Sequence, residues 1–446
     1  MPTLFRHHVP SALVVQLGAE TTILAAAAGT AGLASQVLQP GGVPFLSLVQ
    51  TGLAAVACWL GMVACGLYQR DLRDGPRELL LRTTLGVGLA SLALLPFANV
   101  LEGRWPAQAG VLAAGWLGVL SARLGCGPAA RQHRVLVLGS PGQAASLRAL
   151  RRASDRQGTC FVGFVDGSAC APTPGQPSLG ELVRRYAADE VVVALAERRD
   201  ALPLQALLDC KLRGVRVSLE REFIERHLGR VALESLTPGT LVFDAGFHPG
   251  AWRRASQRAC DLLVAVPMLL LALPLMLLAA CAIWLEDGRP VLYTQQRVGL
   301  GGRPFALYKF RSMRRDAEAD GEARWAAAAD SRVTRVGRFL RRTRIDELPQ
   351  LFNVLQGCMS LVGPRPERPS IVAGLQRQVP WYALRHHVRP GLTGWAQVRY
   401  PYGASVEDAR AKLEFDLYYL KHASLFLDLD ILLHTAQVLL WGRGVR

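Results

Sequence analysis

Two adjacent acidic residues, Asp346 and Glu347, lie in a stretch that is otherwise rich in arginine. Apolar residues recur after position 344 at spacings of three or four, as on one face of a helix. The two carboxylates are therefore predicted to lie at a helix N-terminus, where free N–H groups and the helix dipole favour anions. The arginines are Arg335, Arg338, Arg341, Arg342, Arg344 and Arg365, and the apolar face is Ile345, Leu348, Phe352 and Leu355.

Carboxylates, guanidinium groups and a helix N-terminus are together what phosphoryl chemistry requires. Arg365 lies between Pro364 and Pro366, which fix the backbone, so we predict that its guanidinium group binds a substrate phosphate. The alternative for this stretch alone is a helix cap or a solvated surface. Thr343-x-x-Asp346 resembles a capping box, which is consistent with that alternative.

Further basic residues lie on a predicted pair of strands, residues 291–298 and 305–313, joined by a glycine-rich connection. On the second strand, Lys309 and Arg311 share a face because side chains alternate. Both side chains are therefore predicted to reach the same anion as a phosphate-binding pair. A solvated strand face is the alternative.

The composition points to an anionic partner. The chain has 446 residues and a net charge of +16, carried mostly by arginine. Nucleic acid is disfavoured, because the basic residues cluster beside apolar segments and around the carboxylate pair, and no nucleic-acid-binding motif is present. The nine cysteines include no C-x-x-C pair, which disfavours both a disulfide framework and a cysteine metal site.

Residues 1–131 are predicted to form a domain of four transmembrane helices. Each apolar segment supplies the ~20 residues that a bilayer span needs, although a buried helical core is the alternative. Arginines follow the second and fourth segments, so the N-terminus and the remainder of the chain are predicted to face the cytoplasm. Glu20 is either a functional intramembrane acid or a residue near the end of its span. The segments are residues 11–38, 44–67, 79–100 and 107–124.

Residues 132–245 are predicted to form a Rossmann-like parallel α/β domain, because buried strands alternate with helices. The glycine fingerprint for nucleotides is incomplete: Gly139 and Gly142 are present, but Pro141 and Ala145 break the pattern. A structural or regulatory role is favoured over nucleotide binding. The predicted strands are residues 134–139, 161–165, 190–194 and 215–219.

Residues 246–446 form the third predicted domain, which begins with a membrane segment, Leu262–Leu285. Arginines flank it on both sides, so both ends are predicted to lie on the cytoplasmic face. Pro274 is central and bends a helix. We therefore predict a re-entrant helix that breaks near Pro274 and returns. A kinked span is the alternative.

Three long motifs in this third domain resemble the bacterial sugar transferase family, the polyprenyl-phosphate hexose-1-phosphate transferases. They read PVLYTQQRVGLGGRPFALYKFRSM, DSRVTRVGRFLRRTRIDELPQLFNVLQGCMSLVGPRPERP and RPGLTGWAQVRYPYG. The resemblance is strong over residues 250–446 and architectural elsewhere. The chain is similar to the long form of the family, and to the subgroup that initiates exopolysaccharide synthesis beside PEP-CTERM/exosortase systems.

The resemblance implies roles for the acidic pair. Asp346 is expected to attack the β-phosphate of a UDP-sugar, with UDP-glucose favoured, and to release UMP. The sugar-phosphoryl group then passes to undecaprenyl phosphate. Glu347 is the second catalytic residue, and Mg²⁺ is expected as cofactor with Asp346 as a ligand. The implied location is the bacterial inner membrane, as a multi-pass protein with its catalytic domain on the cytoplasmic face. A homo-oligomer is left open.

The chain departs from the family pattern at two places. Cys358 replaces an aspartate that could hold the turn leading to Arg365, and Leu273 replaces a serine before Pro274. Two other functions are alternatives. A membrane-bound nucleotide-sugar dehydratase or epimerase would need an intact glycine fingerprint and a Tyr-x-x-x-Lys pair. A non-enzymatic scaffold for glycan assembly is disfavoured by the intact acidic pair.

Overall fold

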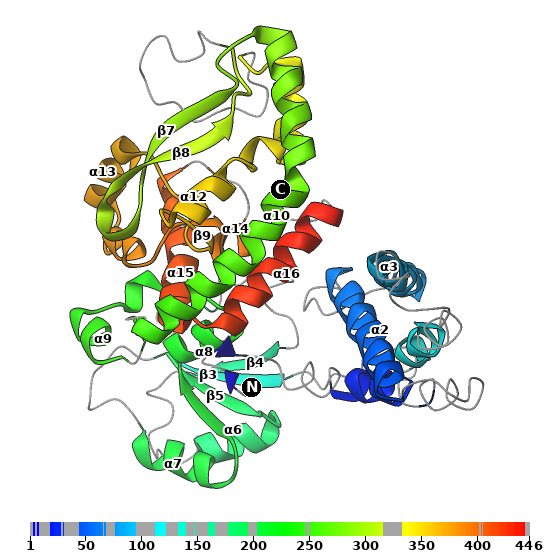
Figure 1. The fold of residues 1–446 in the computed structure, drawn as a ribbon. Helices are drawn as coiled ribbons and strands as arrows, with labels where there is room; N and C mark the ends of the chain where they lie inside the picture. Colours follow the sequence, from blue (N-terminus) through cyan, green and yellow to red (C-terminus); the bar gives the residue numbers. More distant parts are fainter. Residues whose placement is uncertain are drawn as a thin grey trace. The chain divides into compact units, whose positions relative to one another are not determined.

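The computed structural model shows two compact units, each with a hydrophobic core of its own (Figure 1). The first comprises Met1–Thr3 and His8–Gly229, and the second Leu4–His7 and Arg230–Arg446. The structure describes residues 3–4, 7–8, 18–27, 30, 44–65, 67, 76–94, 112–121, 133–139, 147, 159–165, 177–194, 203–244, 246–247, 250–314, 332–400, 403 and 405–441.

The first unit has helical residues in each of the four segments predicted to span the membrane. They are 18–27, α2 (Pro44–Ala64), α3 (Pro76–Leu94) and 112–121. The helices α2 and α3 touch backbone to backbone, since a Cβ on Gly61 would lie 2.1 Å from the Gly86 carbonyl oxygen. Glu20 is buried. Among the described residues only a later helix is long and apolar enough to cross a membrane, so four spans remain a prediction.

A four-stranded parallel sheet in the order β4-β3-β5-β6 follows, which confirms the predicted α/β arrangement of this part. Gly139 packs at the sheet, where a Cβ would lie 2.7 Å from the Ala194 carbonyl oxygen, so this glycine serves close packing. Gly142 lies outside the described residues. The elements are β3 (His133–Leu138), β4 (Thr159–Val165), α6 (Leu179–Arg185), β5 (Glu190–Val193), α7 (Leu204–Leu212), β6 (Arg216–Leu219) and α8 (Glu220–Leu228).

Glu190 at the start of β5 is fully buried, and its carboxylate is surrounded by hydrogen-bond donors. His133 Nε2 lies 2.7 Å from Glu190 Oε2, the Ser218 hydroxyl donates to Oε1 over 2.5 Å, and Arg226 forms an ion pair with Oε1. Burial alone would raise the pKa of Glu190, but these contacts outweigh it and lower the pKa to about 2. The cluster therefore ties β5 to β3, β6 and α8 through one buried charge.

The boundary between the units differs from the predicted one. Residues 230–244 belong to the second unit, whereas the sequence assigned them to the Rossmann-like domain. The N–H of Val231 donates to the Glu414 carbonyl, and Leu233 is buried in the core of the second unit. This segment contains η5 (Leu233–Ser235) and α9 (Pro238–Phe243). Its apolar residues have a partner in that core, which local sequence patterns do not reveal.

The second unit contains the antiparallel hairpin of β7 (Leu292–Val298) and β8 (Pro304–Phe310), and the parallel pair of β9 (Ser360–Val362) and β10 (Gly391–Thr393). The strand β8 ends at Phe310, whereas the second strand was predicted to extend to residue 313. Buried residues of α15, including Leu413 and Tyr418, contribute to the main core. The other elements are α10 (Ala251–Asp287), η6 (Leu300–Gly302), α11 (Arg335–Thr343), η7 (Ile345–Glu347), α12 (Gln350–Gln356), α13 (Pro369–Gln378), η8 (Tyr382–His387), α14 (Trp395–Arg399), α15 (Val406–His422) and α16 (Leu425–Trp441).

The helix α10 contains the predicted membrane segment and is long and apolar enough to cross a membrane. It is helical throughout, with Pro267 and Pro274 inside it, and Figure 1 shows it bent. The helix thus continues across Pro274, since a proline removes only one backbone hydrogen bond. The re-entrant break at this proline stays a prediction. Many of its leucines are exposed, among them Leu271 at 84%. The re-entrant course itself remains a prediction.

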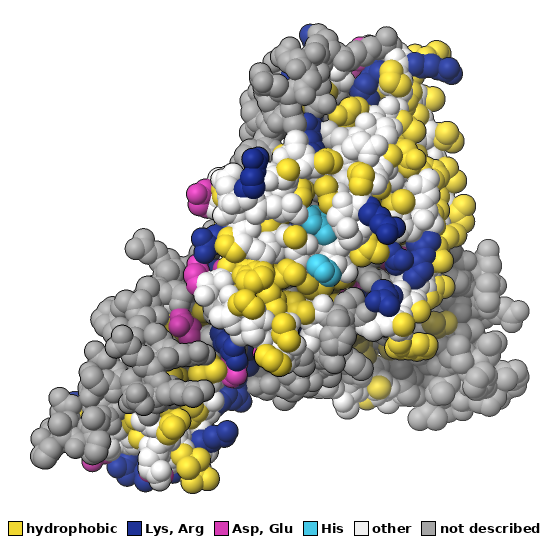
Figure 2. All heavy atoms as spheres, turned by 90° about the vertical axis from the view of Figure 1, so that its left-hand side faces the viewer, with side chains coloured by type: hydrophobic (Ala, Val, Ile, Leu, Met, Phe, Trp, Pro, Cys, Tyr) yellow, Lys and Arg dark blue, Asp and Glu magenta, His cyan; other side chains and the backbone are white. Residues whose placement is uncertain are grey.

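Exposed apolar surface is not confined to one spot. Figure 2 shows hydrophobic side chains next to Lys and Arg side chains on the face that it presents. Exposed hydrophobic residues include Val242 and Phe243 of α9 and Trp252 of α10. Apolar groups bordered by cations are the combination that a membrane surface with anionic headgroups attracts.

Candidate active site

The acidic pair lies in a short turn between two helices. The helix α11 ends at Thr343, and the next residue, Arg344, adopts a left-handed conformation with φ of 61°. Asp346 and Glu347 then occupy the single 3₁₀ turn η7, and Pro349 precedes α12. The pair thus lies in the turn that leads into α12, whereas the sequence predicted it at the N-terminus of that helix.

The buried face of α12 also differs from the prediction. Leu351 and Val354 are fully buried, whereas Phe352 is 39% exposed. Ile345 and Leu348 precede α12, which begins at Gln350, so half of the predicted face lies outside this helix. Ile345, which the pattern placed on this face, packs against a smaller cluster with Phe310 and Leu340.

Glu347 is the centre of a cationic cluster. Its Oε1 atom lies 2.7 Å from Arg365 Nη2, 3.2 Å from Lys309 Nζ and 3.8 Å from Arg344 Nη1. Burial opposes the charge of Glu347, but Arg365 and Lys309 outweigh it and hold its pKa well below the usual range. Glu347 is therefore ionised and already bound to several cations.

Asp346 is buried and differently surrounded. Its Oδ1 atom has no hydrogen-bond partner within the described part of the chain. Burial first, and the neighbouring charge of Glu347 second, raise the pKa of Asp346, although Lys309, Arg341 and Arg344 oppose the rise. An unpartnered buried carboxylate oxygen among positive charges suits either covalent attack or coordination of a hard cation such as Mg²⁺.

Lys309, near the end of β8, lies beside the acidic pair, and its Nζ atom donates to Glu347 Oε1 over 3.2 Å. Burial lowers the pKa of Lys309, and Glu347 counteracts this. Its ammonium group is thus held by one carboxylate, and a second anion such as a phosphate would further favour the protonated form of Lys309.

Arg311 does not lie with Lys309. Its guanidinium group donates to the backbone carbonyls of Asp287 and Gly288 at the end of α10, over 2.9 and 2.8 Å, and its side chain is 7% exposed. The expectation that Lys309 and Arg311 reach one anion is therefore wrong, because β8 ends at Phe310 and the alternation of the strand stops there.

Arg365 is held in place by residues that the sequence reasoning missed. The Arg385 guanidinium donates to the Arg365 carbonyl over 3.0 Å and forms a buried ion pair with Asp416 over 2.8 Å. On the other side, Arg297 donates to the Pro366 carbonyl over 3.0 Å. Asp416 lies inside the apolar run of α15, and a charge in such a run was the one signal that the sequence offered.

The turn that leads to Arg365 does not depend on the side chain of Cys358. The N–H groups of Cys358 and Met359 both donate to the Asn353 carbonyl, and Gly357 supplies the left-handed residue of the turn. The Asn353 side chain is itself fixed, since it bonds the backbone of β8 at two points. Backbone contacts therefore replace what an aspartate at position 358 was expected to provide.

The comparisons with known proteins match this part of the chain. The family described as bacterial sugar transferase matches residues 252–442. The UDP-N-acetylgalactosamine-undecaprenyl-phosphate N-acetylgalactosaminephosphotransferase of Aeromonas hydrophila is 45% identical over 61% of this chain and 62% of its own length. The undecaprenyl-phosphate glucose phosphotransferase of Komagataeibacter xylinus is 44% identical over 43% of this chain and 37% of its own length. The chain thus spans less than two thirds of both relatives.

A shorter relative is covered more completely. The putative undecaprenyl-phosphate N-acetylgalactosaminyl 1-phosphate transferase of Bacillus subtilis is 53% identical over 29% of this chain, which amounts to 73% of that protein. The match to the family runs from the start of α10 to the end of α16 and so includes every residue around the acidic pair. On these grounds the chain belongs to the bacterial sugar transferase family.

Proposed function

We propose that this protein transfers a sugar 1-phosphate from a UDP-sugar to undecaprenyl phosphate and releases UMP. The observation that carries the proposal is the difference in surroundings between two adjacent carboxylates. Glu347 is bound by Arg365 and Lys309, whereas Asp346 Oδ1 has no hydrogen-bond partner in the described residues. One acid thus organises cations and the other remains available to react.

In the proposed reaction, Asp346 attacks the β-phosphorus of the donor. The bond between this phosphorus and the oxygen that bridges it to the α-phosphate breaks, and UMP leaves with the electron pair. A phosphate oxygen of the acceptor then attacks the sugar-phosphoryl group on Asp346, which restores the carboxylate. Arg365 and Lys309 stabilise the negative charge that develops on the transferred phosphoryl group.

Mg²⁺ belongs to this proposal as the cofactor. The orphaned oxygen of Asp346 fits a hard cation, which prefers carboxylate oxygen ligands. Such an ion would help neutralise the pyrophosphate of the donor. Asp346 would hold it, and the nearby guanidinium groups would share the remaining phosphate charge.

The donor sugar is open between two candidates. Our sequence-based prediction is UDP-glucose, and several relatives are named for glucose. The Aeromonas relative is named for N-acetylgalactosamine and matches more of this chain. We further propose the setting that the resemblance implied: a multi-pass protein of the bacterial inner membrane that starts exopolysaccharide synthesis beside a PEP-CTERM/exosortase system.

The decisive experiment supplies the purified full chain, in phospholipid vesicles containing undecaprenyl phosphate, with a panel of UDP-sugars. We expect Mg²⁺-dependent release of UMP with one or two donors. Without the acceptor, the release of UMP should stop after a single turnover. A dehydratase or epimerase would change the sugar without releasing UMP, and a scaffold would do neither. Either outcome would refute the proposal.

A further inference from the structure

Hydrogen bonds connect α10 to the segments that carry the site residues, and they fall into two groups. One group lies before Pro267, at Arg258 and Asp261, and the other lies after Pro274, at residues 286–288. We infer that α10 is the frame of the active site, and that these two groups hold the two sides of the site at a fixed separation. The inference rests on the proposed function, because the site meant is the transferase site.

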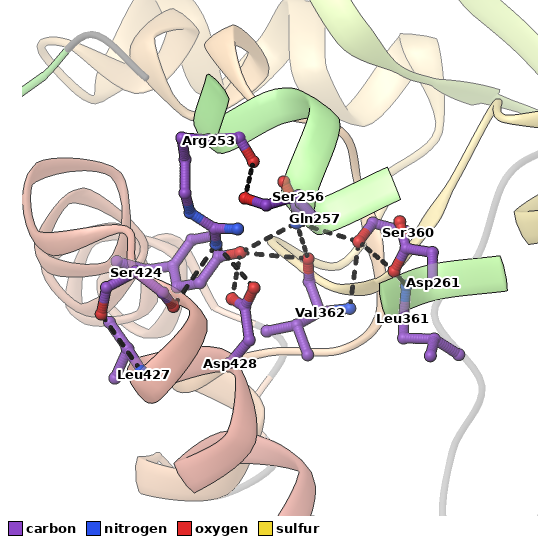
Figure 3. Close-up of polar contacts among 11 residues, drawn as sticks. Arg253, Ser256, Gln257, Asp261, Ser360, Leu361, Val362, Ser424, Leu427 and Asp428 are labelled. Carbon is purple, nitrogen blue, oxygen red and sulfur yellow. Dashed lines mark hydrogen bonds and ion pairs between the residues drawn. The ribbon is translucent and has the colours of Figure 1, made fainter. Parts of the chain in front are cut away.

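The first group controls Arg365. Asp261 is 3% exposed, and its Oδ1 atom accepts hydrogen bonds from the Ser360 hydroxyl and the Leu361 N–H, each over 2.9 Å (Figure 3). These residues belong to β9, which leads within a few residues into the turn that carries Arg365. Gly363 lies on this path, and a Cβ added to it would lie 2.9 Å or less from backbone atoms near Arg389. The path from α10 to Arg365 is therefore short and tightly packed.

Neighbouring side chains support this contact. Gln257 of α10 donates to the Ser360 hydroxyl over 2.9 Å and to the Val362 carbonyl over 3.2 Å (Figure 3). Tyr419 donates to the same Val362 carbonyl. Because β9 is bonded at three successive residues, it cannot shift along α10 without breaking several buried hydrogen bonds. The network continues through Asp428 to Arg253.

Arg258 belongs to the same group and fixes the end of α12. Its guanidinium group donates to the carbonyls of Val354 and Leu355, over 2.5 and 2.6 Å. These carbonyls are in the last turn of α12, where the helix itself leaves carbonyl groups short of N–H partners. The helix that follows the acidic pair is thereby attached to the first half of α10.

The second group controls the acidic pair and Lys309. Arg311 bonds the carbonyls of Asp287 and Gly288, and it follows Lys309 by two residues. Glu286 accepts hydrogen bonds from the N–H groups of Arg335 and Val336, over 2.8 and 3.0 Å.

Those two N–H groups start α11, the helix that leads into the turn of Asp346 and Glu347. Pro267 and Pro274 of α10 lie between the two groups of contacts. The first group positions Arg365, and the second group positions the turn that carries Glu347. Arg365 Nη2 and Glu347 Oε1 lie 2.7 Å apart. A change in the bend or in either group would therefore move Arg365 relative to Glu347. Asp261 and Glu286 are thus positioning residues, which act through the side chains that touch substrate.

The test is a double-mutant cycle on kcat/KM for UMP release, measured with the full chain in vesicles. Asp261→Leu removes the acceptor, whereas Asp261→Asn keeps an acceptor oxygen and should retain activity within about threefold of wild type. We expect Asp261→Leu to lower kcat/KM about tenfold in the wild-type background but less than about twofold in an Arg365→Lys background, since the residue acts through Arg365. Ser360→Ala, a milder change, replaces Asp261→Leu in the cycle if the latter does not fold.

Equal losses in the two backgrounds would overturn the inference, because a purely structural defect adds to the Arg365 defect. An Asp261→Asn variant as damaged as Asp261→Leu would do the same. On the other side of the bend, Glu286→Ala should lose activity and Glu286→Gln should retain it. If the wild type releases no UMP from any donor, the proposed function fails and the inference with it. If the wild type is active and the cycle is additive, only the inference fails.

Discussion

At the scale of single residues, two carboxylates of nearly the same chemistry are separated by their surroundings. Glu347 is ionised among cations, while burial raises the pKa of Asp346. A buried carboxylate that is ionised at neutral pH lowers the free energy of unfolding. Such groups are found at functional sites, where their charge is needed. The consequence is that activity and stability should respond in opposite directions when Asp346 is changed.

Asp346→Asn and Asp346→Ala should therefore abolish UMP release, with a loss of ~10³-fold or more, because a covalent nucleophile is removed. The pKa of Asp346 is raised in the folded state, so its ionised form destabilises the fold above that pKa. Asp346→Asn should consequently unfold no earlier than wild type in a thermal melt at pH 7. The exposed Glu407→Gln is the matched control and should retain activity. A sugar-phosphate adduct trapped on another residue would contradict the assignment of the nucleophile.

Arg365→Lys should impair transfer well beyond the effect of a surface substitution. Lysine keeps the charge but loses the planar fork that binds a phosphate through two parallel hydrogen bonds. We expect kcat/KM for the UDP-sugar to fall on the order of 10–100-fold. Arg342→Lys, an exposed position on α11, provides the comparison. Wild-type turnover by Arg365→Lys would show that Arg365 only partners Glu347.

At the scale of elements, the course of α10 through the membrane is testable. If both flanks lie on the cytoplasmic face, single cysteines at positions 254 and 303 should react with an impermeant reagent from the same side of sealed vesicles, in a variant without native cysteines. Labelling from opposite sides would establish a full span.

Pro274→Leu tests the role of the bend in the same helix. Removing this proline from an apolar helix should straighten it and favour a full span, so activity should fall as the site leaves its cytosolic donor. Unchanged labelling together with unchanged activity would mean that the contacts of α10 with the rest of the unit, and not the proline, set the bend. The measurement is the same labelling assay combined with UMP release.

At the scale of the whole molecule, the parallel α/β domain should respond to acid independently of the catalytic unit. The pKa of Glu190 is lowered from about 4.5 to about 2. Its contribution to stability is therefore complete above pH 4.5 and is lost as the pH falls towards 2. Glu190→Gln should lose this acid dependence and should destabilise the domain by about 3 kcal/mol, because the partly buried Arg226 is left with an uncompensated charge.

Hydrogen exchange of the peptides covering β3 and β5, measured across pH 2–6 in the full chain, would report on this domain alone. Glu222→Gln, at an exposed position on α8, is the control. Equal exchange in wild type and Glu190→Gln would show that the buried cluster does not stabilise the sheet.

The sequence by itself determined the features that depend on local patterns. The strands of the parallel sheet were readable because buried parallel strands are continuous apolar runs. The apolar character of α10 was readable from its long run of uncharged residues. The family was readable from three long motifs, which carry far more information than a short pattern.

Tertiary structure alone decided the features that depend on contacts between distant segments. Arg311 caps α10 instead of facing Lys309, because the strand ends one residue before it and the carbonyls at the end of α10 lie within reach. Residues 230–244 join the second unit, because their apolar side chains find a core there. Arg385 and Asp416, separated by thirty-one positions, support Arg365 as a buried pair. No local pattern encodes such pairings, since their energy exists only once the folded chain brings the partners together and excludes water.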